Sequence, residues 1–219
     1  MPRMAWFGWI IAAYLIGALP FGFLIGKLQG VDLRTVGSGN VGATNVGRVL
    51  GRKWGAACFA LDLLKGAAPV LAYGRAMAGD GALELLVWLA VAAAAVLGHV
   101  FPIYLRFKGG KGVATGLGVL LGFWPVLTLP GLAAAGLWLA TLGATRYVSL
   151  ASVLAAASLP LLTAISAWAW GRPAPELALY VAVTLLLALL VVLRHRDNIA
   201  RLRAGTEPQV GRQARQSPG

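Results

Sequence analysis

The chain has 219 residues, of which 59% are hydrophobic and only 12% are charged, and its formal net charge is +12. This composition is too apolar for a soluble domain of that size, so it excludes the soluble classes and indicates an integral membrane protein. The single cysteine, Cys58, excludes an internal disulfide framework and offers no metal-ligand spacing. We interpret it as a small buried hydrophobic residue.

Apolar stretches recur along the whole chain and leave no separate soluble domain; they are 6–26, 54–73, 83–105, 113–144, 147–170 and 177–193. The first lacks a small-residue cleavage site and is long for a signal-peptide core, so we expect a retained helix. The fourth is too long for one ordinary span. Because it contains Pro125 and Pro130, which break or kink membrane helices, we expect it to cross the membrane twice.

The basic residues gather in three loops and the C-terminal tail, not on one soluble face or motif that would bind nucleic acid. If all of these segments face the cytoplasm, the chain crosses seven times, with its N-terminus outside and its C-terminus cytoplasmic. A six-span alternative would place the basic tail on the opposite side of the membrane from two of the basic loops, which the charge distribution disfavours. Seven spans leave 113–124 short, about 18 Å at 1.5 Å per residue, which requires a tilted, re-entrant or locally thinned setting.

These observations predict an all-α polytopic membrane protein with seven transmembrane helices, some of them short or broken. We expect a single membrane domain over residues 1–205. Residues 206–219 are expected to form a disordered cytoplasmic tail.

Two polar segments in the first half of the chain have the composition of anion-binding loops. The first, "VGSGNVGATNVGR", covers residues 36–48 and lies between two of the most apolar stretches. The second, "GHVFPIYLRFKGGKGVAT", covers 98–115 and places Lys108 and Lys111 around a glycine pair. Glycines let a backbone approach an anion closely, and ammonium groups supply the countercharge. The pattern is not a Walker loop, and the alternative is that these basic residues only fix the topology.

Two further polar segments lie in the second half of the chain. "ATRYVSLAS", residues 144–152, places Ser149 and Ser152 on one face of a helix, where serines more commonly serve helix packing. "RHRDNIARLRAG", residues 194–205, places His195 and Asn198 on one helix face. A basic amphipathic stretch on anionic headgroups would explain the arginines of this segment but not Asn198.

Ionisable residues also occur inside the apolar stretches. Asp62 and Lys65 are three residues apart and can neutralise each other; we favour a structural pair over a functional one, although ionisable groups at membrane depth are functional candidates. His99 heads "GHVFP" and could equally bond a neighbouring backbone group or act on a substrate.

Several common catalytic patterns are absent from the sequence. There is no HxxxxD, GxSxG or HExxH motif and no acidic cluster for a divalent metal. An enzyme of this composition would therefore use neither an acyl-serine triad nor a metal. It would bind anions through Gly, Ser, Asn, Lys and Arg, and preorganised donors would do most of the catalysis.

Taken together and in order, "GSGNVGATNVGR", "GHVFPIYLRFKGGKGVAT", "RYVSLAS" and "RHRDNIARL" resemble the conserved blocks of the bacterial PlsY family, the acyl-phosphate:glycerol-3-phosphate acyltransferases. The resemblance implies a seven-helix, monomeric enzyme of the cytoplasmic (inner) membrane, whose site opens to the cytoplasm. Such an enzyme moves a fatty acyl group from acyl phosphate to the 1-hydroxyl of sn-glycerol 3-phosphate. The products are 1-acylglycerol 3-phosphate (lysophosphatidate) and inorganic phosphate, for phospholipid synthesis. No acyl-enzyme, metal, cofactor, coenzyme A or nucleic acid is expected.

The resemblance also implies the site residues. The catalytic residues carried over are Ser38, Arg48, Lys111, Ser152, His195 and Asn198. The substrate- and phosphate-binding residues are Gly37, Gly39, Asn40, Thr44, Asn45, Lys108, Gly109, Gly110, Gly112 and Ser149. One mechanism proposed for the family is substrate-assisted: the phosphate of glycerol 3-phosphate takes the proton from its own hydroxyl during the attack.

Two other functions are compatible with a basic polytopic protein. A small anion or organophosphate transporter would also place basic residues near broken helices, but the two halves of the chain show no convincing repeat. A membrane scaffold would hold anionic lipid through the basic tail.

Overall fold

The computed structural model describes residues 4–76, 79 and 81–211, and every regular element in this part of the chain is helical. The prediction of an all-α protein is confirmed there. The elements are α1 (Met4–Gly17), α2 (Phe21–Leu28), α3 (Ala43–Leu50), α4 (Arg52–Ala76), α5 (Ala82–Val100), the 3₁₀ turn η1 (Ile103–Leu105), α6 (Val113–Leu121), α7 (Thr128–Thr145), α8 (Val148–Ala169), α9 (Ala174–Arg194) and α10 (Arg196–Arg203).

Among the described residues, six helical segments are long and apolar enough to cross a membrane. They are Met4–Leu28, Arg52–Ala76, Ala82–Leu105, Thr128–Thr145, Val148–Ala169 and Ala174–Arg194. The fourth apolar stretch is divided, as expected: α6 ends at Leu121 and α7 begins at Thr128, with Pro125 between them. Pro130 does not break a helix. It lies in the first turn of α7, where a missing backbone N–H removes no helical hydrogen bond.

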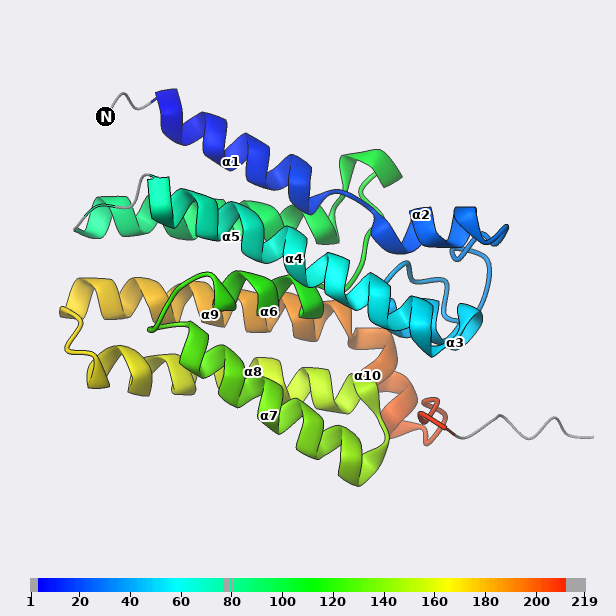
Figure 1. Cartoon of the computed structure of the whole chain (residues 1–219). Coiled ribbons are helices and arrows are strands. Elements are labelled where there is room, and N and C mark those ends of the chain that lie inside the picture. The colour runs from blue at the N-terminus through cyan, green and yellow to red at the C-terminus, as the bar shows by residue number, and fades with distance from the viewer. Residues whose placement is uncertain (1–3, 77–78, 80, 212–219) are drawn as a thin grey trace, which may run out of the picture.

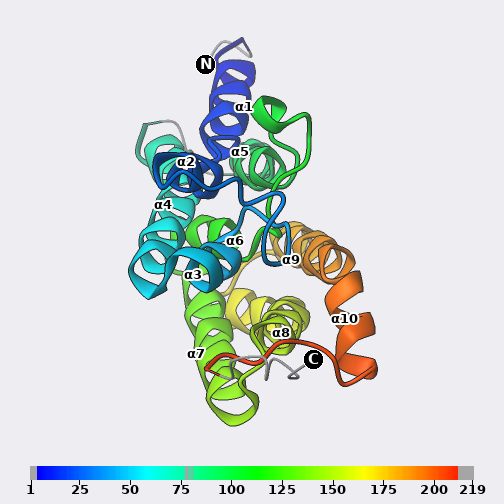
Figure 2. The same ribbon diagram turned by 90° about the vertical axis from the view of Figure 1, so that its right-hand side faces the viewer.

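The long helices lie side by side along one direction (Figure 1). α1, α4 and α5 form one half of the bundle, and α7, α8 and α9 form the other. The short helix α6 lies between the halves, packing mainly on α4 and also contacting α5 and α7. The three short helices α2, α3 and α10 gather at the end of the bundle opposite α1's N-terminus, with α3 and α10 on different sides of that end (Figure 2).

Small residues allow the closest helix contacts. A Cβ added at Gly118 of α6 would overlap the backbone oxygen of Leu63 on α4, and one at Gly66 of α4 would overlap that of Thr115 on α6. Thr115 also donates its hydroxyl hydrogen to the Asp62 carbonyl at 3.0 Å. Inside a membrane the hydrophobic effect does not drive helices together, so close backbone packing and interhelical hydrogen bonds hold them in contact. These contacts fix α6, and with it the polar loop that precedes it, against α4.

Cys58 is fully buried and free, which confirms its interpretation as an interior residue. At the C-terminus, the first residues of the segment expected to be disordered are part of the folded structure. Glu207 is only 8% exposed, and the Val210 N–H donates to the Arg146 carbonyl at 2.9 Å. Residues 212–219, the remainder of the expected tail, lie outside the described residues.

The contact between α4 and α6 is testable by adding a single methyl group. We expect Gly118→Ala to destabilise the protein by about 1–3 kcal/mol, because the methyl group overlaps a helix backbone that cannot move aside cheaply. The measurement is the melting temperature in detergent. Gly136→Ala on α7 is the matched control: it meets no atom within 4 Å, so it should leave stability unchanged or slightly raised. Equal melting temperatures for the two variants would contradict the packing argument.

Candidate active site

The first polar segment forms a loop that Asn45 organises from within. The Asn45 side chain is 1% exposed; its Oδ1 accepts the Ser38 N–H at 2.8 Å. Its Nδ2 donates to the carbonyls of Leu33 (3.3 Å) and Val36 (3.1 Å). Gly37 has φ of +63° and lies so close to the Asn45 amide that no side chain fits there. Asn45 therefore acts as a support that gives the loop its shape.

The polar residues that this loop presents are exposed at the end of the bundle. Ser38, Thr44 and Arg48 are all exposed, while Asn40 closes a turn by accepting the Gly42 N–H at 2.8 Å. Within the described ranges, no hydrogen bond or ion pair joins the side chains of Ser38, Thr44 or Arg48 to the other three polar segments. The structure thus leaves these groups available at the surface.

The second segment doubles back against the end of α5. The N–H groups of Gly109 and Gly110 donate to the carbonyls of Val100 (3.2 Å) and His99 (3.1 Å). From the opposite side, Arg194 Nη2 at the end of α9 donates to the Gly109 carbonyl at 3.1 Å. The loop is therefore held between two helices. Of the remaining predicted residues here, Gly112 has φ of +84° at the start of α6, and Lys108 is exposed.

A chain of hydrogen bonds joins the second and fourth segments. Lys111 Nζ donates to Asn198 Oδ1. Asn198 Nδ2 donates to Glu207 Oε1 at 2.6 Å, and Arg201 Nε donates to Glu207 Oε2 at 2.7 Å. Because Asn198 has both a carbonyl and an amide, it relays between a cation and a carboxylate without carrying a charge itself. Two residues predicted from separate segments, Lys111 and Asn198, are thus in direct contact.

Burial and neighbouring charges determine the protonation of this network. Burial lowers the pKa of Lys111 to about 8, with Glu207 acting in the opposite direction and Arg201 adding to the decrease. Burial alone would raise the pKa of Glu207, but the hydrogen bonds from Asn198 and Arg201 outweigh it and lower that pKa. The carboxylate is therefore charged at neutral pH. The hydroxyl of Ser149, from the third segment, is buried near this carboxylate and makes no hydrogen bond to the described residues.

His195 lies beside this network and is neutral at neutral pH. Burial, and then the positive charge of Lys111, lower the pKa of His195 to about 4. Its Nδ1 lies 2.8 Å from the Val191 carbonyl. Since a carbonyl only accepts, Nδ1 carries the proton, and Nε2 of the neutral ring is left with a lone pair.

Ser152 is buried, and both of its hydrogen bonds go to residues of α7 and α8. Its hydroxyl donates to the Val148 carbonyl at 2.8 Å and accepts the Trp138 Nε1–H at 3.0 Å. The hydroxyl thus joins α7 to α8. Ser149, on the same face of α8, is the serine of this segment that lies next to the network.

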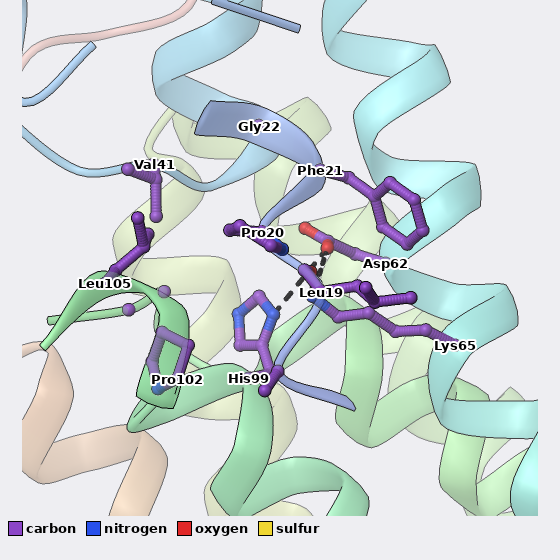
Figure 3. A pocket seen from close by; sticks show the side chains of 13 residues that line it. Leu19, Pro20, Phe21, Gly22, Val41, Asp62, Lys65, His99, Pro102 and Leu105 are labelled. Carbon is purple, nitrogen blue, oxygen red and sulfur yellow. Dashed lines mark hydrogen bonds and ion pairs between the residues drawn. The ribbon is translucent and has the colours of Figure 1, made fainter. Parts of the chain in front are cut away.

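Asp62, Lys65 and His99 form a second polar cluster, inside the bundle. Lys65 Nζ lies 2.8 Å from Asp62 Oδ1, which confirms that the two can neutralise each other. His99 Nδ1 is 3.7 Å from the same oxygen. The cluster borders a small pocket of about 10 Å³, which reaches Pro20 and Phe21 on one side and the glycine loop on the other (Figure 3).

Comparison with known proteins identifies the family. The family model described as glycerol-3-phosphate acyltransferase matches residues 7–205. The chain belongs to this family. A glycerol-3-phosphate acyltransferase of Geotalea daltonii is 47% identical over 199 residues, covering 90% of this chain and 94% of the relative. That of Dinoroseobacter shibae is 46% identical over 207 residues, covering 94% of this chain and 93% of the relative. The resemblance inferred from the four segments is confirmed.

Solved structures agree with the family assignment. The crystal structure of PlsY (YgiH), an integral membrane glycerol 3-phosphate acyltransferase, in its glycerol 3-phosphate form has a TM-score of 0.81 and 42% identity to this chain. The match covers 94% of this chain and 96% of PlsY. The lysophosphatidic acid form of PlsY gives a TM-score of 0.79 at 40% identity. This acyltransferase is therefore an integral membrane protein of the PlsY type.

Sequence reasoning missed Glu207 in this acyltransferase. It placed residue 207 in a disordered tail, whereas the carboxylate is buried and is bonded to Asn198 and Arg201. A signal was present: Glu207 is the only acidic residue after Asp197 in a strongly basic segment. An acid retained among cations is a candidate partner for one of them.

The network predicts how Lys111 titrates when Glu207 loses its charge. Glu207 raises the pKa of Lys111, so we expect Glu207→Gln to lower that pKa below its wild-type value of about 8. Competitive acylation of lysine amines across pH, read for Lys111 by mass spectrometry, measures the midpoint. Glu176→Gln is the control. Glu176 lies in the first turn of α9 and pairs with Arg172, so its loss should not move the Lys111 midpoint. A Lys111 midpoint that stays the same or rises in Glu207→Gln would contradict the network.

Proposed function

We propose that this chain transfers a fatty acyl group from acyl phosphate to the 1-hydroxyl of sn-glycerol 3-phosphate. The products are 1-acylglycerol 3-phosphate and inorganic phosphate. The observation that carries the proposal is the half-buried ammonium of Lys111, which follows two loop glycines and donates to Asn198, which in turn donates to Glu207. The relatives' names, and the glycerol 3-phosphate and lysophosphatidic acid forms of PlsY, support the acceptor and the product.

The proposed reaction needs two phosphoryl groups to be close to each other. The glycerol hydroxyl oxygen attacks the acyl carbonyl carbon, the bond between that carbon and the phosphate oxygen breaks, and the hydroxyl proton passes to the glycerol 3-phosphate phosphate. Lys111 and Arg48 would offset the repulsion between the phosphates, and Ser38 and the loop amides would donate hydrogen bonds to them. The lone pair on His195 Nε2 is suited to accept a hydrogen bond from the other, non-reacting hydroxyl of glycerol 3-phosphate.

The residues next to Lys111 are suited to positioning rather than to covalent catalysis. Ser152 already uses its hydroxyl in the contact between α7 and α8, so we assign it to holding these helices beside the site. Asn198 orients Lys111, and Arg201 supports Glu207. The enzyme is proposed to act as a monomer, without an acyl-enzyme, metal, cofactor or coenzyme A.

We further propose seven membrane passes, with the N-terminus outside and the site open to the cytoplasm of a bacterial inner membrane. α6 has nine residues, about 14 Å of helix, and would cross only part of the bilayer before α7 returns. The ends of α2, α3 and α10 gather at one end of the bundle, and the N-terminus of α1 lies at the other (Figure 1). This arrangement lets all basic loops face one side.

The experiment that tests the function uses the purified protein in detergent with acyl phosphate and glycerol 3-phosphate. We expect release of inorganic phosphate together with formation of lysophosphatidate, which is detected by mass spectrometry. Acyl-coenzyme A in place of acyl phosphate should give no product. Failure to form product while glycerol 3-phosphate binds would refute the proposed acyltransferase activity. Uptake of glycerol 3-phosphate into sealed proteoliposomes would favour a transporter.

Removing either proposed phosphate-binding cation should impair catalysis. We expect Arg48→Ala and Lys111→Ala each to lower kcat/KM for glycerol 3-phosphate more than about tenfold, which corresponds to more than about 1.4 kcal/mol of transition-state stabilisation. Arg203→Ala is the matched control, because Arg203 is an exposed cation in the last turn of α10. It should remain within about twofold of wild type. Near wild-type rates for Arg48→Ala and Lys111→Ala would show that neither residue has the proposed role in binding phosphate.

A further inference from the structure

Burying the ionisable side chains of Asp62, Lys65 and His99 inside the helix bundle costs free energy. The three residues are 3%, 5% and 7% exposed, on the long apolar helices α4 and α5. Removing two charges from water costs several kcal/mol for each ion, and well-packed apolar residues often hold helices together equally well. Ionisable groups at this depth are candidates for a functional role. The cluster therefore calls for a role beyond joining α4 to α5.

The cluster connects the segments around it. Lys65 Nζ donates to the Leu19 carbonyl at 2.7 Å, which ties α4 to the break between α1 and α2. The Asp62 carboxylate lies between Lys65 and the His99 ring, as Figure 3 shows. Since Asp62 and Lys65 are on α4 and His99 is in the last turn of α5, the orientation of the imidazole depends on α4.

His99 supports the glycine loop directly. Its carbonyl accepts the Gly110 N–H at 3.1 Å. A Cβ added at Gly110 would overlap Nε2 of the imidazole, and one at Gly109 would overlap the His99 carbonyl. The ring and the loop are thus in such close contact that no side chain fits between them. A change in the position of the His99 ring must be transmitted to Gly110.

The loop leads immediately to Lys111. Two further side chains hold the loop: Arg194 donates to the Gly109 carbonyl, and Asn198 accepts the Lys111 ammonium. Only one peptide separates Gly110, which rests on His99, from Lys111. The position of the ammonium therefore depends on His99 as well as on Arg194 and Asn198.

We infer that Asp62, Lys65 and His99 are positioning residues that hold the glycine loop so that Lys111 reaches its place in the active site. None of them touches a substrate in this assignment. The inference rests on the proposed function for its catalytic consequence, whereas the placement of Lys111 can be measured without activity.

The chain offers a matched control for general loosening of the same helix pair. Trp88 on α5 donates its Nε1–H to the Val70 carbonyl on α4 at 2.9 Å. Trp88→Phe removes this interhelical hydrogen bond and keeps an aromatic ring. Trp88 lies eleven residues, about three helical turns, before His99 on α5, and among the described residues no hydrogen bond joins its side chain to the glycine loop.

The test compares His99→Ala with Trp88→Phe in the full-length protein. The pH midpoint of Lys111 acylation and kcat/KM for glycerol 3-phosphate are both measured. We expect His99→Ala to raise the Lys111 midpoint toward that of an ordinary lysine, because a displaced loop releases the side chain from burial, and to lower kcat/KM about tenfold or more. Trp88→Phe should leave the midpoint in place and kcat/KM within about twofold.

A second variant covers the case in which His99→Ala does not fold. Gly110→Ala keeps every charge of the cluster and only forces the loop away from the ring, so it should change the Lys111 midpoint and kcat/KM in the same direction. The inference is overturned if the Lys111 midpoint or kcat/KM stays at the wild-type value in the folded variant, or if Trp88→Phe changes either one equally. If the wild-type protein transfers no acyl group, the proposed function fails, and the Lys111 midpoint alone decides whether His99 positions the loop.

Discussion

The candidate site depends on keeping one ammonium group half-buried beside the membrane. Lys111 is withdrawn from water enough for its pKa to fall to about 8, and the hydrogen bond to Asn198 with the nearby Glu207 carboxylate offsets part of that cost. A fully solvated lysine would interact weakly with a phosphate because water screens the charge. A buried lysine without partners would lose its proton. The surrounding helices and loops create the intermediate condition.

The fold supplies this condition by bringing short polar segments together at one end of a helix bundle. The short helix α6 is fixed against α4 through Gly66 and Gly118, and its N-terminal end carries the glycine loop. α9 ends where α10 begins, so Arg194 and Asn198 approach the loop from the other half of the bundle. The exposed loop with Ser38 and α3 with Arg48 complete the same end. Loops set on rigid helices are a common place for binding groups.

Much of this could be predicted from residue types and their order. The apolar stretches determined the helical membrane class, and Pro125 marked the division between α6 and α7. The four polar segments identified the family, and the spacing of Asp62 and Lys65 predicted an ion pair. These features are local: they depend on hydrophobicity over one span or on residues within a helical turn. Glu207 was missed because its partner Asn198 is reached by a chain reversal that no local pattern encodes.

The sequence by itself determined the class of protein, the family and the set of polar residues available for binding anions. Only the tertiary structure decided which of them meet: Lys111 with Asn198, Glu207 with Arg201, and the His99 ring with the glycine loop. It also separated Ser149, beside Glu207, from Ser152, which is bonded to Trp138 between α7 and α8. The physical reason is that membrane helices have apolar faces almost all round. Their rotation and depth are set by close backbone contacts at small residues, and these contacts depend on which helices become neighbours.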